Sequence, residues 1–252
     1  MKYLLSIRFL GSAYQGYQVQ KNGPSVQAEL TRAAKELFGY PCDIVGCSRT
    51  DSGVHAEMFS ATVSKKGQPD LPTAIPTERV PLAMNAHLPE DISVYRATPV
   101  PDNFHARYDV KSKEYRYFIY DDPVRNPFLE GRAFQFRAHL TDEAIDRMNR
   151  AAGNFVGKHD FRAYMAEGSK VSTTERTVFS AGVGREGGCV VFRVEADGFL
   201  YNMVRIMTGT LLAVAEGKLS PEDIPRVTDS LDRRLAGATA PAEGLYLWQV
   251  RY

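Results

Sequence analysis

Residues 176–196, RTVFSAGVGREGGCVVFRVEA, decide the fold. Runs rich in β-branched and aromatic residues at 176–185 and 189–196 flank the tripeptide Glu186-Gly187-Gly188. Consecutive glycines supply the positive φ angles that a tight turn between antiparallel strands requires. The stretch therefore predicts a β-hairpin, and with it a sheet that is at least partly antiparallel.

Helices are predicted on both sides of this hairpin. Thr141 is placed to cap a helix that runs to Ala152, and residues 200–216 have apolar side chains at helical spacing. Earlier in the chain, Ser25 is placed to cap a helix that Gly39 ends. The other expected elements are strands at 3–9, 42–47, 58–64, 92–98, 111–120 and 245–252 and helices at 78–85 and 221–230. Paired strands with helices between them predict an α+β fold with a mostly antiparallel sheet, in two halves, residues 1–103 and 104–252.

The composition is that of an ordinary globular protein. The chain of 252 residues can bury a sizeable core, and 44% apolar and 24% charged residues are typical values. No apolar run reaches the roughly 18 residues of a membrane span, and Arg8 interrupts the short apolar start, so neither an anchor nor a signal peptide is expected. Three cysteines are too few for a disulfide framework or a zinc cage, which favours the cytoplasm. A net charge of +1 does not by itself indicate a nucleic-acid partner.

Residues 46–56, GCSRTDSGVHA, form a predicted loop between two strands and are the first candidate site. A nucleophilic Ser52 would need a histidine base and oxyanion donors within reach, and no known nucleophile elbow surrounds it. Asp51 and His55 stand four apart, but Gly53 argues against the helix that would let both bind one metal ion. The Asp51 carboxylate either shapes a turn or reacts, and the loop alone leaves both interpretations open.

Two further stretches carry charge in informative places. Residues 103–120, NFHARYDVKSKEYRYFIY, interleave basic and aromatic side chains, a combination that can bind phosphates and stack on bases. A plain amphipathic strand would show the same pattern. Residues 196–207, ADGFLYNMVRIM, place Arg205 on an otherwise apolar helix. Such an arginine either extends to solvent or pairs with a buried acid, and Asp51 is a candidate for that acid.

Together these stretches resemble the TruA family of tRNA pseudouridine synthases. Residues 49–56, RTDSGVHA, are similar to the family signature Arg-Thr-Asp-Ala-Gly-Val-His-Ala. The resemblance continues in order through residues 9–18, 104–107, 113–117, 159–161, 197–205 and 240–247. The departures from the residues usual in the family are Leu10, Tyr17, Ser48, Ser52 and Glu243. They leave the loop geometry and the substrate preference open.

The resemblance implies an isomerase that converts uridine to pseudouridine in the anticodon stem-loop of tRNA, at positions 38, 39 and 40, without metal or cofactor. It implies Asp51 as the catalytic carboxylate, Arg205 as the cation that keeps it ionised, and Tyr115 as the ring that stacks on the flipped uracil. The residues implied to contact the substrate are Arg49, His55, Arg107, Lys113, Tyr115, Arg116 and Leu245, with Lys111, Arg162 and Lys170 as further basic candidates. Arg49 and His55 are expected to support either the loop or the RNA.

The same resemblance implies an arrangement of the whole molecule. It comprises two RRM-like α/β halves with the catalytic cleft between them, in a cytoplasmic homodimer that binds the tRNA anticodon arm and no membrane. Two other functions stay open on the residues alone. A non-catalytic RNA-binding module would bind tRNA without forming product. A carboxylate-dependent glycosidase would release free uracil and would need a second acid, for which Glu57 is the nearest candidate in sequence.

Overall fold

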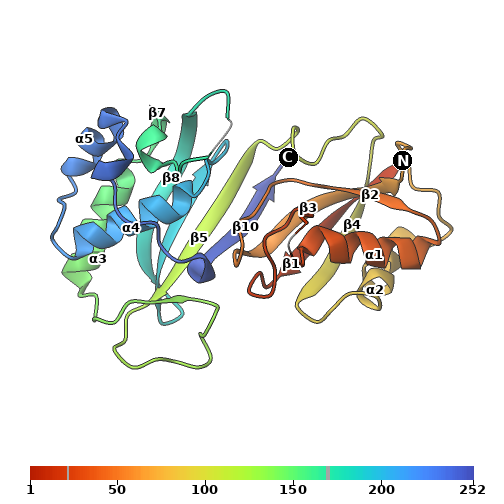
Figure 1. Ribbon diagram of the computed structural model, residues 1–252, viewed down its shortest axis with the longest axis horizontal. Coiled ribbons are helices and arrows are strands. Elements are labelled where there is room, and N and C mark those ends of the chain that lie inside the picture. The colour runs from red at the N-terminus through yellow and green to blue at the C-terminus, as the bar shows by residue number, and fades with distance from the viewer. Residues whose placement is uncertain (22, 169–170) are drawn as a thin grey trace. The chain divides into compact units, whose positions relative to one another are not determined.

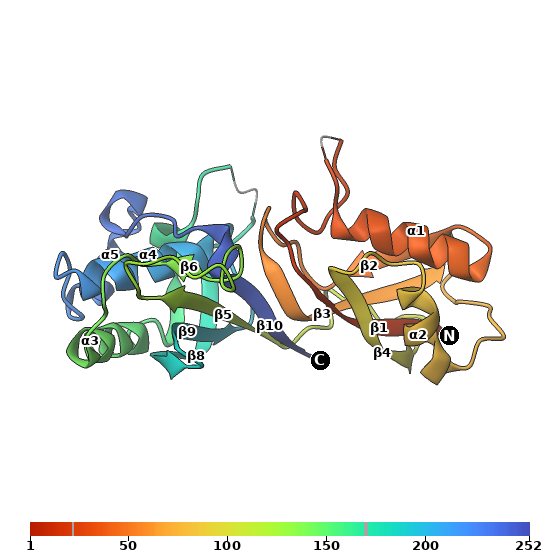
Figure 2. The same ribbon diagram turned by 90° about the horizontal axis from the view of Figure 1, so that it is seen from below.

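A computed structural model describes residues 1–252 except Asn22, Ser169 and Lys170. The chain divides into two compact units: unit 1 is Met1–Lys111 with Leu247–Tyr252, and unit 2 is Ser112–Tyr246. The division thus falls after Lys111, where a boundary after residue 103 was expected, and the end of the chain returns to unit 1. Figure 1 and Figure 2 show the elements of each unit in two views.

Unit 1 is built on a sheet in which β1 lies between β3 and β4. Its elements are β1 (Lys2–Phe9), α1 (Val26–Phe38), β2 (Cys42–Gly46), β3 (His55–Lys65), η1 (Thr77–Arg79), α2 (Val80–Asn85), β4 (Ile92–Val100) and most of β10 (Leu245–Arg251). β1 pairs antiparallel with β3 and β4, β2 pairs antiparallel with β3, and β10 also neighbours β3. The order β4-β1-β3-β2 and the chain order βαββαβ are those of a ferredoxin-like half.

The core of unit 1 lies between this sheet and its helices. Alternation along β1 places Leu5 and Ile7 on the covered face, and both are 0% exposed. α1 packs on β2 and α2 on β4 (Figure 1). α1 begins where the sequence predicts because Ser25 Oγ accepts the Ala28 N–H, and it ends because Gly39 adopts a φ of 76°.

Unit 2 repeats the first part of this order (strand, helix, two strands, helix), with two short strands inserted. Its elements are β5 (Ser112–Tyr120), β6 (Phe134–Gln135), α3 (Asp142–Gly153), β7 (Gly157–Asp160), η2 (Arg162–Tyr164), β8 (Glu175–Glu186), β9 (Cys189–Ala196), α4 (Met203–Ala215), α5 (Asp223–Ser230), η3 (Arg233–Leu235) and η4 (Ala242–Gly244). The predicted hairpin is β8–β9, and β9 also pairs antiparallel with β5. β9 therefore lies between β5 and β8, as β3 lies between β1 and β2. Helix α3 packs on β8 and on α4, and α4 packs on β5 (Figure 2).

The segment that follows η3 approaches α4 at backbone distance. A Cβ placed on Gly209 would lie 1.7 Å from the Ala238 carbonyl oxygen, and one placed on Gly237 would lie 2.3 Å from the Gly209 carbonyl carbon. The Gly237 N–H also donates to Thr210 Oγ1 at 2.9 Å. Glycine at 209 and 237 is therefore what allows residues 237–240 to lie directly on the helix.

The predicted α+β class with a mostly antiparallel sheet is confirmed, since the pairs around β1, β3, β8 and β9 run antiparallel and β6 runs parallel to β5. The helix predicted over 200–216 begins only at Met203, because Asn202 adopts a left-handed φ of 58°. In the part of the chain that the structure describes, every helix is too short or too polar to cross a membrane.

Candidate active site

Asp51 opens a tight turn between β2 and β3. The Val54 N–H donates to the Asp51 C=O at 3.2 Å, and Gly53 at the third position has a φ of 79°, as a turn with a left-handed third residue requires. Asp51 is partly buried and Arg49 is exposed. Residues 51–54 therefore do not form the helix that the metal hypothesis needs. Among the described residues, no group of three or more His, Cys, Asp or Glu side chains is placed to hold a metal ion.

Residues 11–17 lie against this turn, and we refer to them as the loop clamp. A Cβ on Gly16, whose φ is 96°, would lie 2.4 Å from the Thr50 carbonyl oxygen. A Cβ on Gly11 would lie 2.0 Å from the Val54 carbonyl oxygen. Because a side chain at either glycine would push the turn away, the loop clamp fixes the main chain on both sides of the candidate carboxylate.

Hydrogen bonds complete the loop clamp. The Tyr14 C=O accepts the Gly53 N–H and the Ser52 hydroxyl, each at 3.3 Å. The Thr50 C=O accepts the Tyr17 N–H at 3.3 Å. Ser52, considered above as a nucleophile, thus uses its hydroxyl as a donor to the backbone.

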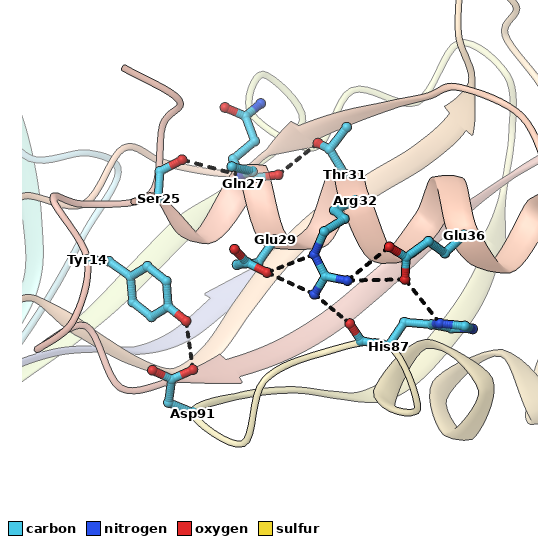
Figure 3. Close-up of polar contacts among 10 residues, drawn as sticks. Tyr14, Ser25, Gln27, Glu29, Thr31, Arg32, Glu36, His87 and Asp91 are labelled. Atoms are coloured by element: carbon cyan, nitrogen blue, oxygen red, sulfur yellow. Dashed lines mark hydrogen bonds and ion pairs between the residues drawn. The ribbon is translucent and has the colours of Figure 1, made fainter. Parts of the chain in front are cut away.

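A side-chain hydrogen bond ties the loop clamp to the residue that precedes β4. Tyr14 Oη donates to Asp91 Oδ1 at 2.7 Å (Figure 3). The Asp91 C=O accepts the Leu10 N–H at 2.9 Å. Burial, and then the Asp91 carboxylate, raise the pKa of Tyr14 well above its usual value. The phenol therefore keeps its proton, and this donor, at neutral pH.

His55 is the first residue of β3 and is 0% exposed. Its Nδ1 accepts the Gly11 N–H at 2.9 Å, so the proton of the neutral ring lies on Nε2. The sequence predicts that His55 supports the loop or contacts the RNA. The structure places the ring inside unit 1, where it supports the loop clamp.

His55→Ala is expected to lower the free energy of unfolding by about 2–4 kcal/mol, because it leaves the buried Gly11 N–H without its acceptor and opens a cavity. Urea denaturation of the purified variant measures this change. His55→Asn keeps an acceptor close to the Nδ1 position and is expected to recover part of the loss. A His55→Ala variant as stable as the wild type would show that the imidazole does not support the turn.

Tyr115 and Leu245 belong to unit 2, and both are buried. Tyr115 lies on β5 and is 7% exposed, and its ring meets Phe199 edge-on with the ring centroids 5.0 Å apart. Leu245, the first residue of β10, is 5% exposed. The stacking role of Tyr115 and the role of Leu245 as an apolar wall stay predictions.

Arg205 lies on the first turn of α4 and is oriented by two acceptors of its own unit. Its Nε donates to the Ala240 C=O at 2.7 Å, and its Nη1 donates to Asn202 Oδ1 at 2.8 Å. Ala240 ends the segment that lies on α4 at Gly209. The pairing of Arg205 with Asp51, which belongs to unit 1, stays a prediction.

Arg116 takes part in an ion-pair network on β5 and the β8–β9 hairpin. Its Nε contacts Glu114 at 2.8 Å and its Nη1 contacts Glu186 at 3.3 Å, while Arg193 contacts the same Glu186. The hydrogen bond from Arg193 outweighs burial and lowers the pKa of Glu186. The side chains of Arg116 and Glu114 are only 18% and 13% exposed. Arg116 thus has carboxylate partners within the sheet, and its contact with RNA stays a prediction.

The other basic candidates are distributed over both units. Arg107 and Lys111 are exposed in unit 1. Arg162 is exposed and Lys113 partly buried in unit 2. Lys170 lies outside the described residues. Of the predicted contact residues, Arg49 and Arg107 are the pair that one cavity of unit 1 brings together.

Glu243, one of the departures from the family pattern, lines a cavity of about 260 Å³ in unit 2 together with Glu130 and Arg137. Burial, and then the Glu130 carboxylate, raise the pKa of Glu243. Glu130 and Glu243 thus bring two carboxyl groups to this cavity. A histidine at position 243 would bring an imidazole in place of one of them.

Several residues of the site were not predicted from the sequence. Tyr14 and Asp91 are 77 positions apart, and no spacing rule connects them. Gly11 and Gly16 were the available indication of the loop clamp, since glycine in a loop can mark a place where two main chains approach closely. His105 and Tyr108 line the cavity with Arg107. The sequence indicated them only through their positions next to Arg107 in the basic and aromatic stretch 103–120.

Comparison with known proteins assigns the chain first to a class of enzyme and then to a family. The sequence profile described as tRNA pseudouridine synthase matches residues 5–109 and 151–252, which contain the loop clamp, the Asp51 turn and Arg205. The chain is a pseudouridine synthase, an isomerase. It belongs to the tRNA pseudouridine synthase family. Tyr115 falls between the two matched segments.

Named relatives match over the whole chain. A protein of Acetivibrio thermocellus is 42% identical over 249 residues, which cover 98% of this chain and 98% of the relative. One of Ruminiclostridium cellulolyticum is 41% identical over 252 residues, 100% and 99% of the two chains, and one of Moorella thermoacetica is 43% identical over 250 residues, 98% of each. All three are named tRNA pseudouridine synthase A. A solved Cbf5-Nop10-Gar1 complex is a distant likeness, with a TM-score of 0.35 and 13% identity over 82% of this chain and 53% of that chain.

Proposed function

We propose that this protein converts uridine to pseudouridine in the anticodon stem-loop of tRNA, at positions 38, 39 and 40, with Asp51 as the catalytic carboxylate. The observation that supports it most is the Asp51 turn, whose main chain the loop clamp fixes on both sides. A carboxylate that is already in place when the substrate binds stabilises developing charge without a cost of reorganisation. The names of the relatives support tRNA as the substrate.

The proposed reaction is an isomerisation, so substrate and product contain the same atoms. The bond between C1′ and N1 breaks, the uracil turns, and C5 bonds to C1′. C5 then loses a proton and N1 gains one. Asp51 acts by adding to the sugar, by adding to the base or by promoting a glycal route, and each of these needs the carboxylate beside the nucleotide. The balance requires no oxidant or reductant.

The other site residues have distinct roles in this proposal. Tyr115 stacks on the extruded uracil and retains it while it is detached. Arg205 keeps Asp51 ionised, and Leu245 excludes water, which would otherwise hydrolyse the sugar at C1′. The burial of Leu245 and the hydrogen bonds that fix Arg205 support the roles of these two residues. Contacts with the RNA are assigned to Arg49, Arg107, Lys113 and Arg116.

The proposal includes a cytoplasmic homodimer that binds the anticodon arm with both subunits, and a catalytic cleft between the two halves of each chain. The dimer rests on the resemblance, and the net charge of +1 per chain is compatible with it. Two nearly neutral chains can align their basic patches into a broad surface that one chain lacks.

Incubation of the wild-type protein with an unmodified tRNA transcript, in the presence of a chelator, tests the proposal. We expect pseudouridine at positions 38, 39 or 40, loss of the C5 hydrogen measured as tritium release, and no free uracil. Free uracil would instead indicate a glycosidase, and tRNA binding without product would indicate a binding module. The candidate second acid of a glycosidase, Glu57, is paired with Arg8 at 3.0 Å.

A further inference from the structure

Unit 1 contains a cavity of about 230 Å³ beside the Asp51 turn. Its described lining residues include Tyr17 of the loop clamp, Arg49, His105, Arg107 and Tyr108. Asp51 is not one of these lining residues. A ligand in this cavity is therefore not the nucleotide that reacts. Pockets that enclose a drug-sized molecule measure roughly 300–1,000 Å³, so this smaller cavity fits one part of a larger ligand.

The wall formed by residues 105–109 is a preformed turn. The His105 N–H donates to Asp109 Oδ2 at 2.8 Å, and the Asp109 N–H donates to the His105 C=O at 3.1 Å. The N–H groups of Arg107 and Tyr108 donate to His105 Nδ1 at 3.1 and 3.3 Å. Backbone groups, the His105 ring and the Asp109 carboxylate thus close the turn, and the side chains of Arg107 and Tyr108 are not needed to hold it.

Tyr108 is 74% exposed although it is a large aromatic side chain. Its ring centroid lies 4.2 Å from that of His105, and the Arg107 guanidinium lies 5.8 Å from it. Aromatic rings flanked by guanidinium groups stack on the bases of single-stranded RNA regardless of base identity. Because His105 Nδ1 accepts two N–H groups, its Nε2 carries the proton and adds a donor to the lining.

The charge of the lining selects an anion. Arg49 and Arg107 approach from separate segments of unit 1, and none of the described lining residues is acidic. Paired guanidinium groups match the geometry of a phosphate. Arg49 precedes Asp51 by two residues, a reach of at most about 7 Å along the chain, so an occupant of the cavity is a close neighbour of the reacting nucleotide.

We infer that this cavity binds a second nucleotide of the tRNA, adjacent to the target uridine, with its phosphate at Arg49 and Arg107 and its base on Tyr108. The inference rests on the proposed function and specifies how the RNA strand is held beside the reacting nucleotide. The grip is independent of base identity, because it uses a phosphate and a ring face. These contacts therefore determine where along the RNA strand the protein holds it, and not which base is bound.

Titration of fluorescently labelled tRNA with Tyr108→Ala, Tyr108→Phe and Arg107→Ala, at several salt concentrations, tests this inference. We expect Tyr108→Ala to raise Kd roughly 10-fold or more, the effect of losing one stacked base, and Tyr108→Phe to stay near the wild-type value. Arg107→Ala is expected to raise Kd and to reduce the slope of log K against log salt by about 1, whereas Tyr108→Ala leaves that slope unchanged. Tyr95→Ala is the matched control, a tyrosine of the same unit that is 39% exposed and lies outside the cavity lining.

The outcomes separate this inference from the proposed function. If the wild type forms pseudouridine and Tyr108→Ala binds tRNA as Tyr95→Ala does, the inference is overturned and the proposed function stands. If binding depends on Tyr108 and Arg107 but the wild type forms no product, the cavity is supported as an RNA site and the proposed function is overturned. An unchanged salt slope in Arg107→Ala overturns the phosphate assignment. A wild type that binds no tRNA overturns both.

Discussion

Asp51→Asn is expected to reduce pseudouridine formation by roughly 10⁴-fold or more while folding and tRNA binding are kept. A neutral amide cannot add to the nucleotide or stabilise positive charge at C1′, and removal of a group that acts at the reacting atoms has effects of this size. The turn survives, because it is closed through the Asp51 C=O and the Val54 N–H, which the substitution retains. Tritium release from tRNA in a single turnover, with enzyme in excess, measures the chemical step without product release.

Ser52→Ala is the control for this variant, since Ser52 stands in the same turn. It removes one hydrogen bond, from Ser52 Oγ to the Tyr14 C=O, and is expected to remain within about 10-fold of the wild type. Full activity of Asp51→Asn would refute the carboxylate mechanism and direct attention to Tyr115. Equal, large losses in both variants would show that the shape of the turn dominates over its charge.

Gly209→Ala is expected to lower the free energy of unfolding by about 2–4 kcal/mol and to lower the rate of pseudouridine formation per folded molecule. The new methyl group would lie 1.7 Å from the Ala238 carbonyl oxygen, so residues 237–240 must move away from α4. The Ala240 C=O of this segment accepts the hydrogen bond from Arg205 Nε at 2.7 Å. The same displacement therefore removes an acceptor that orients the guanidinium.

Gly153→Ala provides the comparison, because Gly153 is also helical and no described atom lies within 4 Å of its added Cβ. It is expected to be neutral or to stabilise the protein by up to about 1 kcal/mol. Urea denaturation of both variants isolates the effect of the close approach. Equal stability of the two would contradict that approach. Reduced stability of Gly209→Ala with undiminished product formation would show that the segment does not position Arg205.

The elements that local signals determine were predictable from the sequence. Ser25 and Gly39 bound α1, Thr141 caps α3 and Gly187-Gly188 turns the β8–β9 hairpin, because caps and turns depend on residues a few positions away. β6 and β7 were not predicted, since they have two and four residues. Strands this short show no periodicity and exist only because β5 and β8 offer a partner.

The candidate site was predictable only where a motif carries it. The loop at Asp51 and a supporting role for His55 were expected, but the partner of His55 was not, because Gly11 lies 44 positions away. Alternation places Arg116 on the face opposite Tyr115, and its partner Glu186, 70 positions along the chain, could not be anticipated from spacing. Contacts over such separations are set by the packing of the whole unit, which no local pattern encodes.

Unit 1 is synthesised first but completed last, because most of strand β10 belongs to it. Residues Leu247–Tyr252 belong to unit 1 but leave the ribosome only after all of unit 2. The Lys111 N–H donates to the Arg251 C=O at 2.8 Å, and the Tyr252 hydroxyl donates to the Ala106 C=O at 2.8 Å. Lys111 and Ala106 therefore cannot form these hydrogen bonds until residues 251 and 252 have been synthesised. At about 5–20 residues per second, synthesis of unit 2 takes roughly 7 to 27 seconds. During that time the part of β3 that later neighbours β10 is an open strand edge on the nascent chain.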